Sequence, residues 1–153
     1  MQLVVQKEKL KTAESIPMGQ KSYFSKTITE GDVALFAGIT GDFAPLSLNQ
    51  EFAKSTPFQD RIVQTMLLAT YTWPVTTAIA SPGAVTIAQD SIFLKPVKVG
   101  DTITAVGEVV KKILEKKIVI IRTTCFNQHD EMVLDGSCVE LMRVHETKEG
   151  TKS

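Results

Sequence analysis

The stretch IVQTMLLATYTWPVTTAIA, residues 62–80, decides the fold class of this chain. It is apolar on nearly all sides, which is typical of a helix buried against a sheet rather than one lying on the surface. We therefore predict one long helix over residues 61–80. Proline lacks the N–H that a helix interior needs, so Pro74 should kink or end this helix near Trp73.

The residues after this helix have the pattern of strands. Past the Ser-Pro-Gly at 81–83, the segments 84–94, 101–128 and 131–144 are rich in β-branched side chains and partly alternate between apolar and polar. Turn-forming residues around Gly100, in LEKK at 114–117 and in NQHDE at 127–131 separate the strands. The pattern predicts an antiparallel meander of about four strands following one long helix, which is an α+β arrangement.

Two shorter helices are predicted before the long one. Thr29 is a suitable N-cap for a helix over residues 30–38, with acidic side chains in its first turn. Asn49 can cap a second helix over residues 50–54. Between them lies a loop that carries Asp42 and Pro45, and another loop, STPFQD, follows at 55–60.

Composition excludes several classes of function. The chain has 153 residues, 43% hydrophobic, which suits a single domain with its own core. The 17 basic and 17 acidic side chains balance, so no net field favours nucleic acid or an anionic membrane. Neither a signal peptide nor an apolar run of about 18 residues is recognisable, so we expect a cytoplasmic protein without membrane contact. Cys125 and Cys138 lack CxxC spacing and a nearby His, which predicts buried, reduced thiols and no metal site.

Five segments in a fixed order resemble one known family. They are GDFAP at 41–45, EFAKSTPF at 51–58, RIVQTMLLA at 61–69, SPGAVTIAQDSIFLKPVKVGDTITA at 81–105 and VLDG at 133–136. The order resembles the MaoC-like (R)-specific enoyl-CoA hydratases of the hotdog fold, over about residues 20–143. The resemblance implies a curved antiparallel sheet wrapped around a long central helix. It also implies one domain over residues 1–153, with a core at about 20–143 and a polar tail at 144–153.

The resemblance implies a catalytic loop from which this chain departs. In the family the loop reads GDxNPxH, and its Asp and His together hold the water that adds to an enoyl thioester. Here Asp42 matches the Asp, whereas Ala44 and Ser47 stand in place of the Asn and the His. Because a serine hydroxyl does not titrate near neutral pH, it does not replace an imidazole, and losing a general acid or base costs about 10²- to 10⁴-fold in rate.

The start of the central helix departs in the same way. The family tends to read GRIAHGM, and this chain reads DRIVQTM, so that Asp60, Gln64 and Thr65 replace Gly, His and Gly. His129 and His145 are in the wrong places to compensate. The candidate catalytic residues are therefore Asp42, Ser47 and Gln64, with Asp42 also open to the simpler interpretation of a residue that stabilises a turn.

The resemblance also implies where a thioester would bind. A backbone N–H at the start of the central helix, near Thr65 or Met66, would meet the thioester carbonyl. Tyr71 and Trp73 are interpreted as core or dimer contacts rather than substrate contacts. The candidate substrate-binding residues are Phe43, Phe58, Thr65, Met66, Leu67 and Lys95, with Lys98 as a further candidate for the coenzyme A phosphates.

Three functions stay open. The first is a hydratase or dehydratase, a lyase of the EC 4.2.1 type with altered catalysis, acting on a coenzyme A or carrier-protein thioester. The second is a thioester-binding subunit that pairs with a catalytic MaoC-like chain, and the third is a thioesterase on the same scaffold. In each case coenzyme A is part of the substrate, no separate cofactor is expected, and a homodimer or higher oligomer is the expected assembly.

Overall fold

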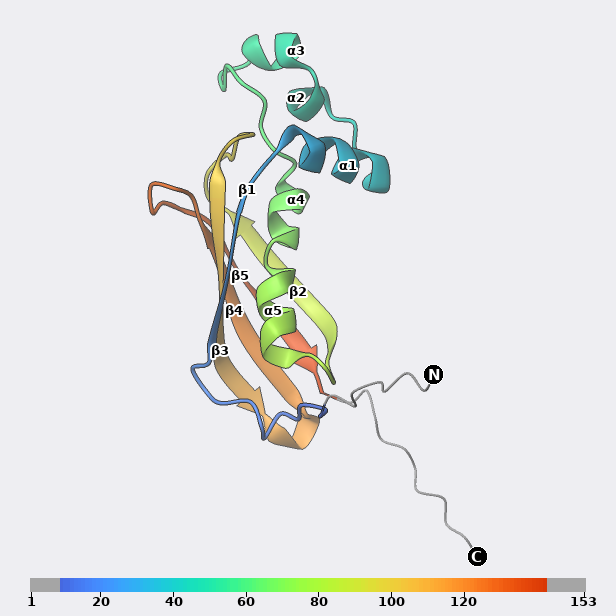
Figure 1. Ribbon diagram of the computed structural model, residues 1–153, viewed down its shortest axis with the longest axis vertical. Coiled ribbons are helices and arrows are strands. Elements are labelled where there is room, and N and C mark those ends of the chain that lie inside the picture. Colours follow the sequence, from blue (N-terminus) through green and yellow to red (C-terminus); the bar gives the residue numbers. More distant parts are fainter. Residues whose placement is uncertain (1–8, 143–153) are drawn as a thin grey trace, which may run out of the picture.

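Five antiparallel strands form one sheet along one side of the helices (Figure 1). The computed structural model describes residues 9–142, so the predicted tail at 144–153 and most of the N-terminal segment lie outside it. The order across the sheet is β1-β3-β4-β5-β2. The strands are β1 (Lys21–Thr27), β2 (Val85–Phe93), β3 (Thr102–Ile113), β4 (Ile118–Phe126) and β5 (Met132–Leu141).

The alternation of side chains in β3 shows how the sheet meets the helix. Ile103, Ala105 and Val109 are buried, and the alternate positions 104, 106 and 108 are partly exposed, so one face of the strand points at the core. Gly107 belongs to this inner face, where an added Cβ would lie 3.1 Å from Val75 Cγ2. The absence of a side chain at Gly107 therefore allows the central helix to approach the sheet closely.

The predicted meander is correct for three strands and wrong for the rest. β3, β4 and β5 follow one another and pair in sequence order. β2, predicted to begin the meander, instead pairs with β5 at the far edge, with Val85 opposite Leu141. β1 was not predicted, because KSYFSKT is short and polar enough to pass for a loop. Side-chain alternation identifies a strand but carries no information about which strand lies beside it.

The predicted long helix is two helices on nearly one line. α4 (Thr65–Thr70) and α5 (Trp73–Ala80) are separated by a turn at Tyr71 and Thr72 (Figure 1). The break falls close to Trp73, as the proline predicted, and Pro74 occupies the first turn of α5, where its missing N–H costs nothing. Residues 61–64 are not helical, since the Val63 N–H donates to the Val97 carbonyl over 2.8 Å.

The short helices form a separate end of the molecule, above α4 in Figure 1. α1 (Glu30–Thr40) has the predicted Thr29 cap, completed by Asp32 as a capping box. α3 (Gln50–Lys54) has the predicted Asn49 cap, whose side chain accepts from the Phe52 N–H over 3.0 Å. The loop predicted between them contains one unforeseen helical turn, α2 (Pro45–Leu48).

Buried apolar side chains make two clusters on the inner face of the sheet. One surrounds α4 and includes Leu68 and Val75, and the other surrounds Ile79 near the end of α5. Cys125 and Cys138 are free and buried, as predicted. Across residues 9–142, the structure contains no helix with the length and apolar character needed to cross a membrane.

Candidate active site

Asp42 stands at the sharp turn that ends α1. Gly41 adopts the left-handed conformation, φ 76°, and its N–H donates to the Ala37 carbonyl over 2.8 Å, which closes the helix. The Asp42 N–H then donates to Thr40 Oγ1, and Asp42 Oδ1 accepts from the Ala44 N–H, each over 3.2 Å. One carboxylate oxygen thus stabilises the turn. The other forms no hydrogen bond within the described residues, and the side chain is exposed.

Ser47 and Gln64 are both buried, at 6% and 5% exposure, and come from segments that touch. The Ile62 N–H donates to the Leu46 carbonyl over 3.2 Å, which brings the α2 turn against the residues before α4. Gln64 Nε2 donates to the Val33 carbonyl over 3.2 Å, so the start of α4 is tied to α1. Gln64 Oε1 is buried and has no hydrogen-bond partner in the described structure, which leaves a free acceptor there.

The predicted binding residues separate into three groups. Phe58, Thr65 and Lys95 line one cavity of about 330 Å³ together with Leu46, which we call the rim cavity. Phe43 and Met66 are exposed at 66% and 59%, and neither lines that cavity. Leu67 packs in the core around α4. The structure thus brings Thr65 and Lys95 together and assigns Leu67 to packing.

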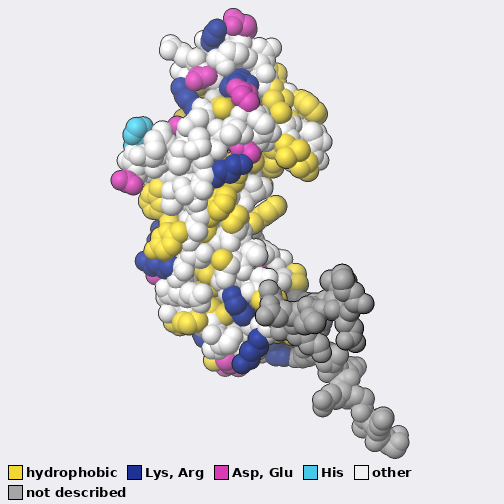
Figure 2. Space-filling model, in the orientation of Figure 1, with side chains coloured by type: hydrophobic (Ala, Val, Ile, Leu, Met, Phe, Trp, Pro, Cys, Tyr) yellow, Lys and Arg dark blue, Asp and Glu magenta, His cyan; other side chains and the backbone are white. Residues whose placement is uncertain are grey.

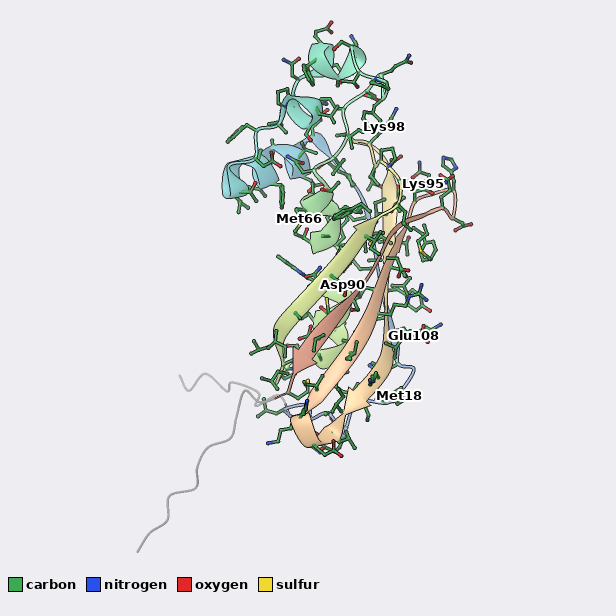
Figure 3. The ribbon with its side chains drawn as sticks, turned by 180° about the vertical axis from the view of Figure 1, so that it is seen from behind. Met18, Met66, Asp90, Lys95, Lys98 and Glu108 are labelled. Carbon is green, nitrogen blue, oxygen red and sulfur yellow. The ribbon has the colours of Figure 1, made fainter. Side chains whose placement is uncertain are left out.

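The two lysines lie at the end of the molecule that carries the short helices. In Figure 3, Lys95 and Lys98 are on the same side as Met66, beyond the end of β2. Each is engaged with a carboxylate: Lys95 forms an ion pair with Glu131, and Lys98 Nζ lies 3.8 Å from Asp60 Oδ2. These ion pairs are exposed, so they leave both ammonium groups accessible to a competing anion.

A cavity next to Thr40 was not predicted from the sequence. It has a volume of about 710 Å³, and we call it the apolar cavity. Thr40, which accepts the hydrogen bond from Asp42, is on its wall. The spacing of Phe36 and Ile39 on one face of α1 was the available signal. The apolar cavity is lined mainly by Phe24, Phe36, Ile39, Tyr71, Trp73 and Pro74.

Tyr71 places a polar atom at the wall of this cavity. Its ring meets Phe24 edge to face, with 6.1 Å between centroids, and its hydroxyl is buried without a hydrogen-bond partner in the described structure. Burial, followed by the nearby Asp32 carboxylate, raises the pKa of Tyr71 to about 12. The hydroxyl is therefore protonated at neutral pH and available as a donor.

Thiol and metal chemistry find little support among the described residues. Burial raises the pKa of Cys125 to about 12 and that of Cys138 to about 11, so both remain thiols at neutral pH. Residues 9–142 contain no group of three or more His, Cys, Asp or Glu side chains placed to hold a metal ion. Tyr71 lines the apolar cavity, whereas Asp42, Ser47 and Gln64 do not line it.

An antiparallel sheet wrapped around a central helix, with a carboxylate turn beside an apolar cavity, defines the class of protein. The fold is the hotdog fold, as predicted. The chain superposes on the (R)-hydratase of Aeromonas caviae involved in PHA biosynthesis with a TM-score of 0.80, at 34% identity, covering 84% of this chain and 98% of that one. The unliganded R-hydratase of Pseudomonas aeruginosa gives a TM-score of 0.79 at 31% identity, covering 86% and 85%.

The chain belongs to the MaoC-like domain family, whose model matches residues 11–129. It is 42% identical to an (R)-specific enoyl-CoA hydratase of Rhodospirillum rubrum over 130 residues, 84% of this chain and 90% of that protein. It is 37% identical to a 3-hydroxybutyryl-CoA dehydratase of Methylorubrum extorquens over 127 residues, 82% and 80% of the two chains. The resemblance seen in the sequence is confirmed, and the chain is hydratase- or dehydratase-like.

Proposed function

We propose that this protein binds an acyl thioester of coenzyme A or of a carrier protein and adds or removes water at its β-carbon, with Asp42 as the base. The observation that carries the proposal is the free carboxylate oxygen of Asp42, whose N–H donates to Thr40 on the wall of the apolar cavity. A cavity of about 710 Å³ with mostly apolar walls has the size and character of a small-molecule site.

The site offers the parts of a hydration reaction except an imidazole. In this proposal the free Asp42 oxygen accepts a proton from the water that adds at the β-carbon and returns a proton to the α-carbon, and Gln64 Oε1, a buried acceptor without a partner in the described structure, and the Ser47 hydroxyl hold that water by hydrogen bonds. The N–H groups of Thr65 and Met66 open α4 and have no backbone or side-chain acceptor among the described residues. These donors suit the thioester carbonyl as enolate charge develops.

The missing histidine sets the expected rate. Serine at position 47 and glutamine at position 64 form hydrogen bonds but do not gain or lose a proton near neutral pH. We therefore expect turnover to be slower than that of a hydratase with the full loop by about 10²- to 10⁴-fold. Coenzyme A phosphates would lie near Lys95, which lines the rim cavity, and near the partly exposed Lys98.

Purified protein mixed with crotonyl-CoA tests the proposal by the loss of enoyl absorbance. We expect slow hydration, and Asp42→Asn should lower it further by at least about 10²-fold while leaving thioester affinity within about threefold. Asp130→Asn, which changes an exposed carboxylate in the turn between β4 and β5, is the control and should leave the rate unchanged. Equal rates for the native protein and Asp42→Asn would contradict the assignment of the base.

A second candidate is a thioester-binding subunit that lacks chemistry of its own. The buried Ser47 and Gln64 favour it, because they keep the site polar without a proton carrier. This function predicts that the protein binds the thioester but causes no loss of enoyl absorbance by itself. Adding a MaoC-like chain with an intact GDxNPxH loop should then start the loss of enoyl absorbance. Release of free thiol in the same assay would instead indicate a thioesterase.

A further inference from the structure

A buried carboxyl group lies at the other end of the helix pair, and the proposed chemistry does not use it. Glu140 is on β5, only 3% exposed, and its Oε1 accepts from the Thr86 hydroxyl over 2.8 Å. It lines a cavity of about 110 Å³, which we call the Glu140 cavity. The other polar side chains around this cavity are Thr76, Thr77, Ser81 and Thr86.

The surroundings of Glu140 leave its hydrogen-bonding capacity unfilled. Its Oε2 atom has no hydrogen bond and its carboxyl group no ion pair within the described residues. Burial raises the pKa of Glu140, partly offset by the Thr86 hydroxyl, which favours the neutral carboxyl group. A neutral carboxyl group can both donate and accept a hydrogen bond, and the cavity is larger than the space that a single water needs.

A third cavity lies between the Glu140 cavity and the apolar cavity. It has a volume of about 400 Å³ between α5 and β2, and we call it the middle cavity. It shares Thr76, Thr77 and Thr86 with the Glu140 cavity. It also shares Trp73 and Thr77 with the apolar cavity, so the three follow one another along α5.

Trp73 lines both the apolar and the middle cavities, and a hydrogen bond orients its side chain. Its Nε1 donates to Gln89 Oε1 over 2.9 Å, and Gln89 Nε2 donates to the Thr72 hydroxyl over 3.2 Å. From Trp73 to Thr77 the helix rises by about 6 Å. An acyl chain that passes Trp73 therefore needs few further carbons before its end meets hydroxyl groups and the Glu140 carboxyl group.

We propose that the Glu140 cavity is a binding subsite for the far end of the acyl chain, selecting thioesters whose chain ends in a hydroxyl group. This inference rests on the proposed function and names the substrate class for the same site. A hydroxyl group donates to and accepts from a neutral carboxyl group and the neighbouring threonines. A plain hydrocarbon end would cover these polar groups without satisfying them, which is unfavourable.

Binding of matched thioesters by isothermal titration tests the inference. The probes are saturated acyl-CoA esters of about twelve to sixteen carbons, because about 15 Å of helix separates Met66 from Thr76 at the Glu140 cavity. Each is compared with the ester that carries a terminal hydroxyl group, and saturated chains undergo no hydration. We expect the hydroxylated member to bind about threefold to tenfold more tightly at one of these lengths. Amino-terminated esters that bind more tightly than the hydroxylated ones would overturn the assignment in favour of an ionised Glu140.

Three variants test whether the side chains of the Glu140 cavity cause the preference for the hydroxylated ester. Glu140→Gln keeps a donor and an acceptor and should retain the preference, whereas Glu140→Met should abolish or reverse it. Thr76→Val removes a cavity hydroxyl with little change of volume and should reduce the preference even if Glu140→Met folds poorly. Thr123→Val is the matched control, since Thr123 is buried but lines none of the three cavities, and it should change nothing.

The outcomes distinguish the two proposals. If every ester binds equally with and without its hydroxyl group, the subsite is wrong and the thioester site stands. If no ester binds at all, the proposed function fails and the subsite fails with it. A preference that survives Glu140→Met and Thr76→Val unchanged would also refute the subsite.

Discussion

Three residues determine the chemistry proposed for this protein: Asp42 in the turn after α1, Ser47 in α2 and Gln64 before α4. Asp42 keeps one oxygen for the turn and one free, while Ser47 and Gln64 stay buried where the family pattern has histidines. The sequence made these three positions candidates because short motifs mark them, and their catalytic roles stay predictions. The apolar cavity was not, since Phe24, Phe36 and Trp73 are distant in sequence and only the fold brings them together.

The buried carboxyl group predicts a pH dependence of stability. Burial raises the pKa of Glu140 above its ordinary value of 4.5. At a pH between the ordinary pKa and the raised pKa of the folded protein, folded Glu140 keeps a proton that the unfolded chain releases. The free energy of unfolding therefore falls as the pH rises through this range. We expect Glu140→Gln to remove this loss, so that the variant gains stability relative to the native protein as the pH rises above about 4.5.

Urea unfolding across that pH range measures the effect, and Glu131→Gln supplies a control of opposite sign. The ion pair with Lys95 lowers the pKa of Glu131, so the native protein gains stability there as pH rises. Because that pair is exposed, its effect should be small. A stability difference for Glu140→Gln that does not vary with pH would show that Glu140 has no raised pKa.

At the scale of elements, the close approach of α5 to the sheet depends on one glycine. A side chain at position 107 would meet Val75 and Ile79, with the nearest atom 3.1 Å from a bare Cβ. We expect Gly107→Val to lower the free energy of unfolding by about 1–3 kcal/mol through overpacking, as measured by chemical denaturation. The neighbouring Val106→Thr, on the other face of β3, should cost much less.

The elements also show where prediction from sequence stops. Both capped helices were predicted with their caps, because Thr29 and Asn49 act on residues three positions away. The proline break was predicted for the same reason, since its cause is local. The pairing of β2 with β5 and the existence of β1 depend on contacts between distant segments, which alternation within one strand does not record.

For the whole molecule, the two sheet edges differ in how they meet solvent. β1 carries Lys21 and Lys26, and lysines discourage pairing with another edge. β2 is longer and exposes Val85, Ile87 and Ile92 at 52%, 52% and 62%. Hydrophobic side chains also gather at the end that carries the short helices and over the hollow beneath it in Figure 2. The free edge of β2 is therefore the surface we expect a second copy to cover.

Sedimentation velocity tests this assembly. The native protein should sediment as a dimer or larger species, and Ile92→Lys should shift it toward the monomer because a charge on the edge opposes pairing. Tyr23→Lys makes the same change at an exposed position on β1 and should leave the assembly intact. A monomeric native protein would contradict the expected dimer.

We propose for the whole molecule that the thioester site around Asp42 lacks only the Asn and His side chains that the family pattern has at positions 44, 47 and 64. The most direct measurement is the hydration rate of crotonyl-CoA by the variant that combines Ala44→Asn, Ser47→His and Gln64→His. We predict a gain of about 10²- to 10⁴-fold over the native protein, abolished when Asp42→Asn is added to the same variant. A folded triple variant with no gain, or a gain that survives Asp42→Asn, would contradict the claim.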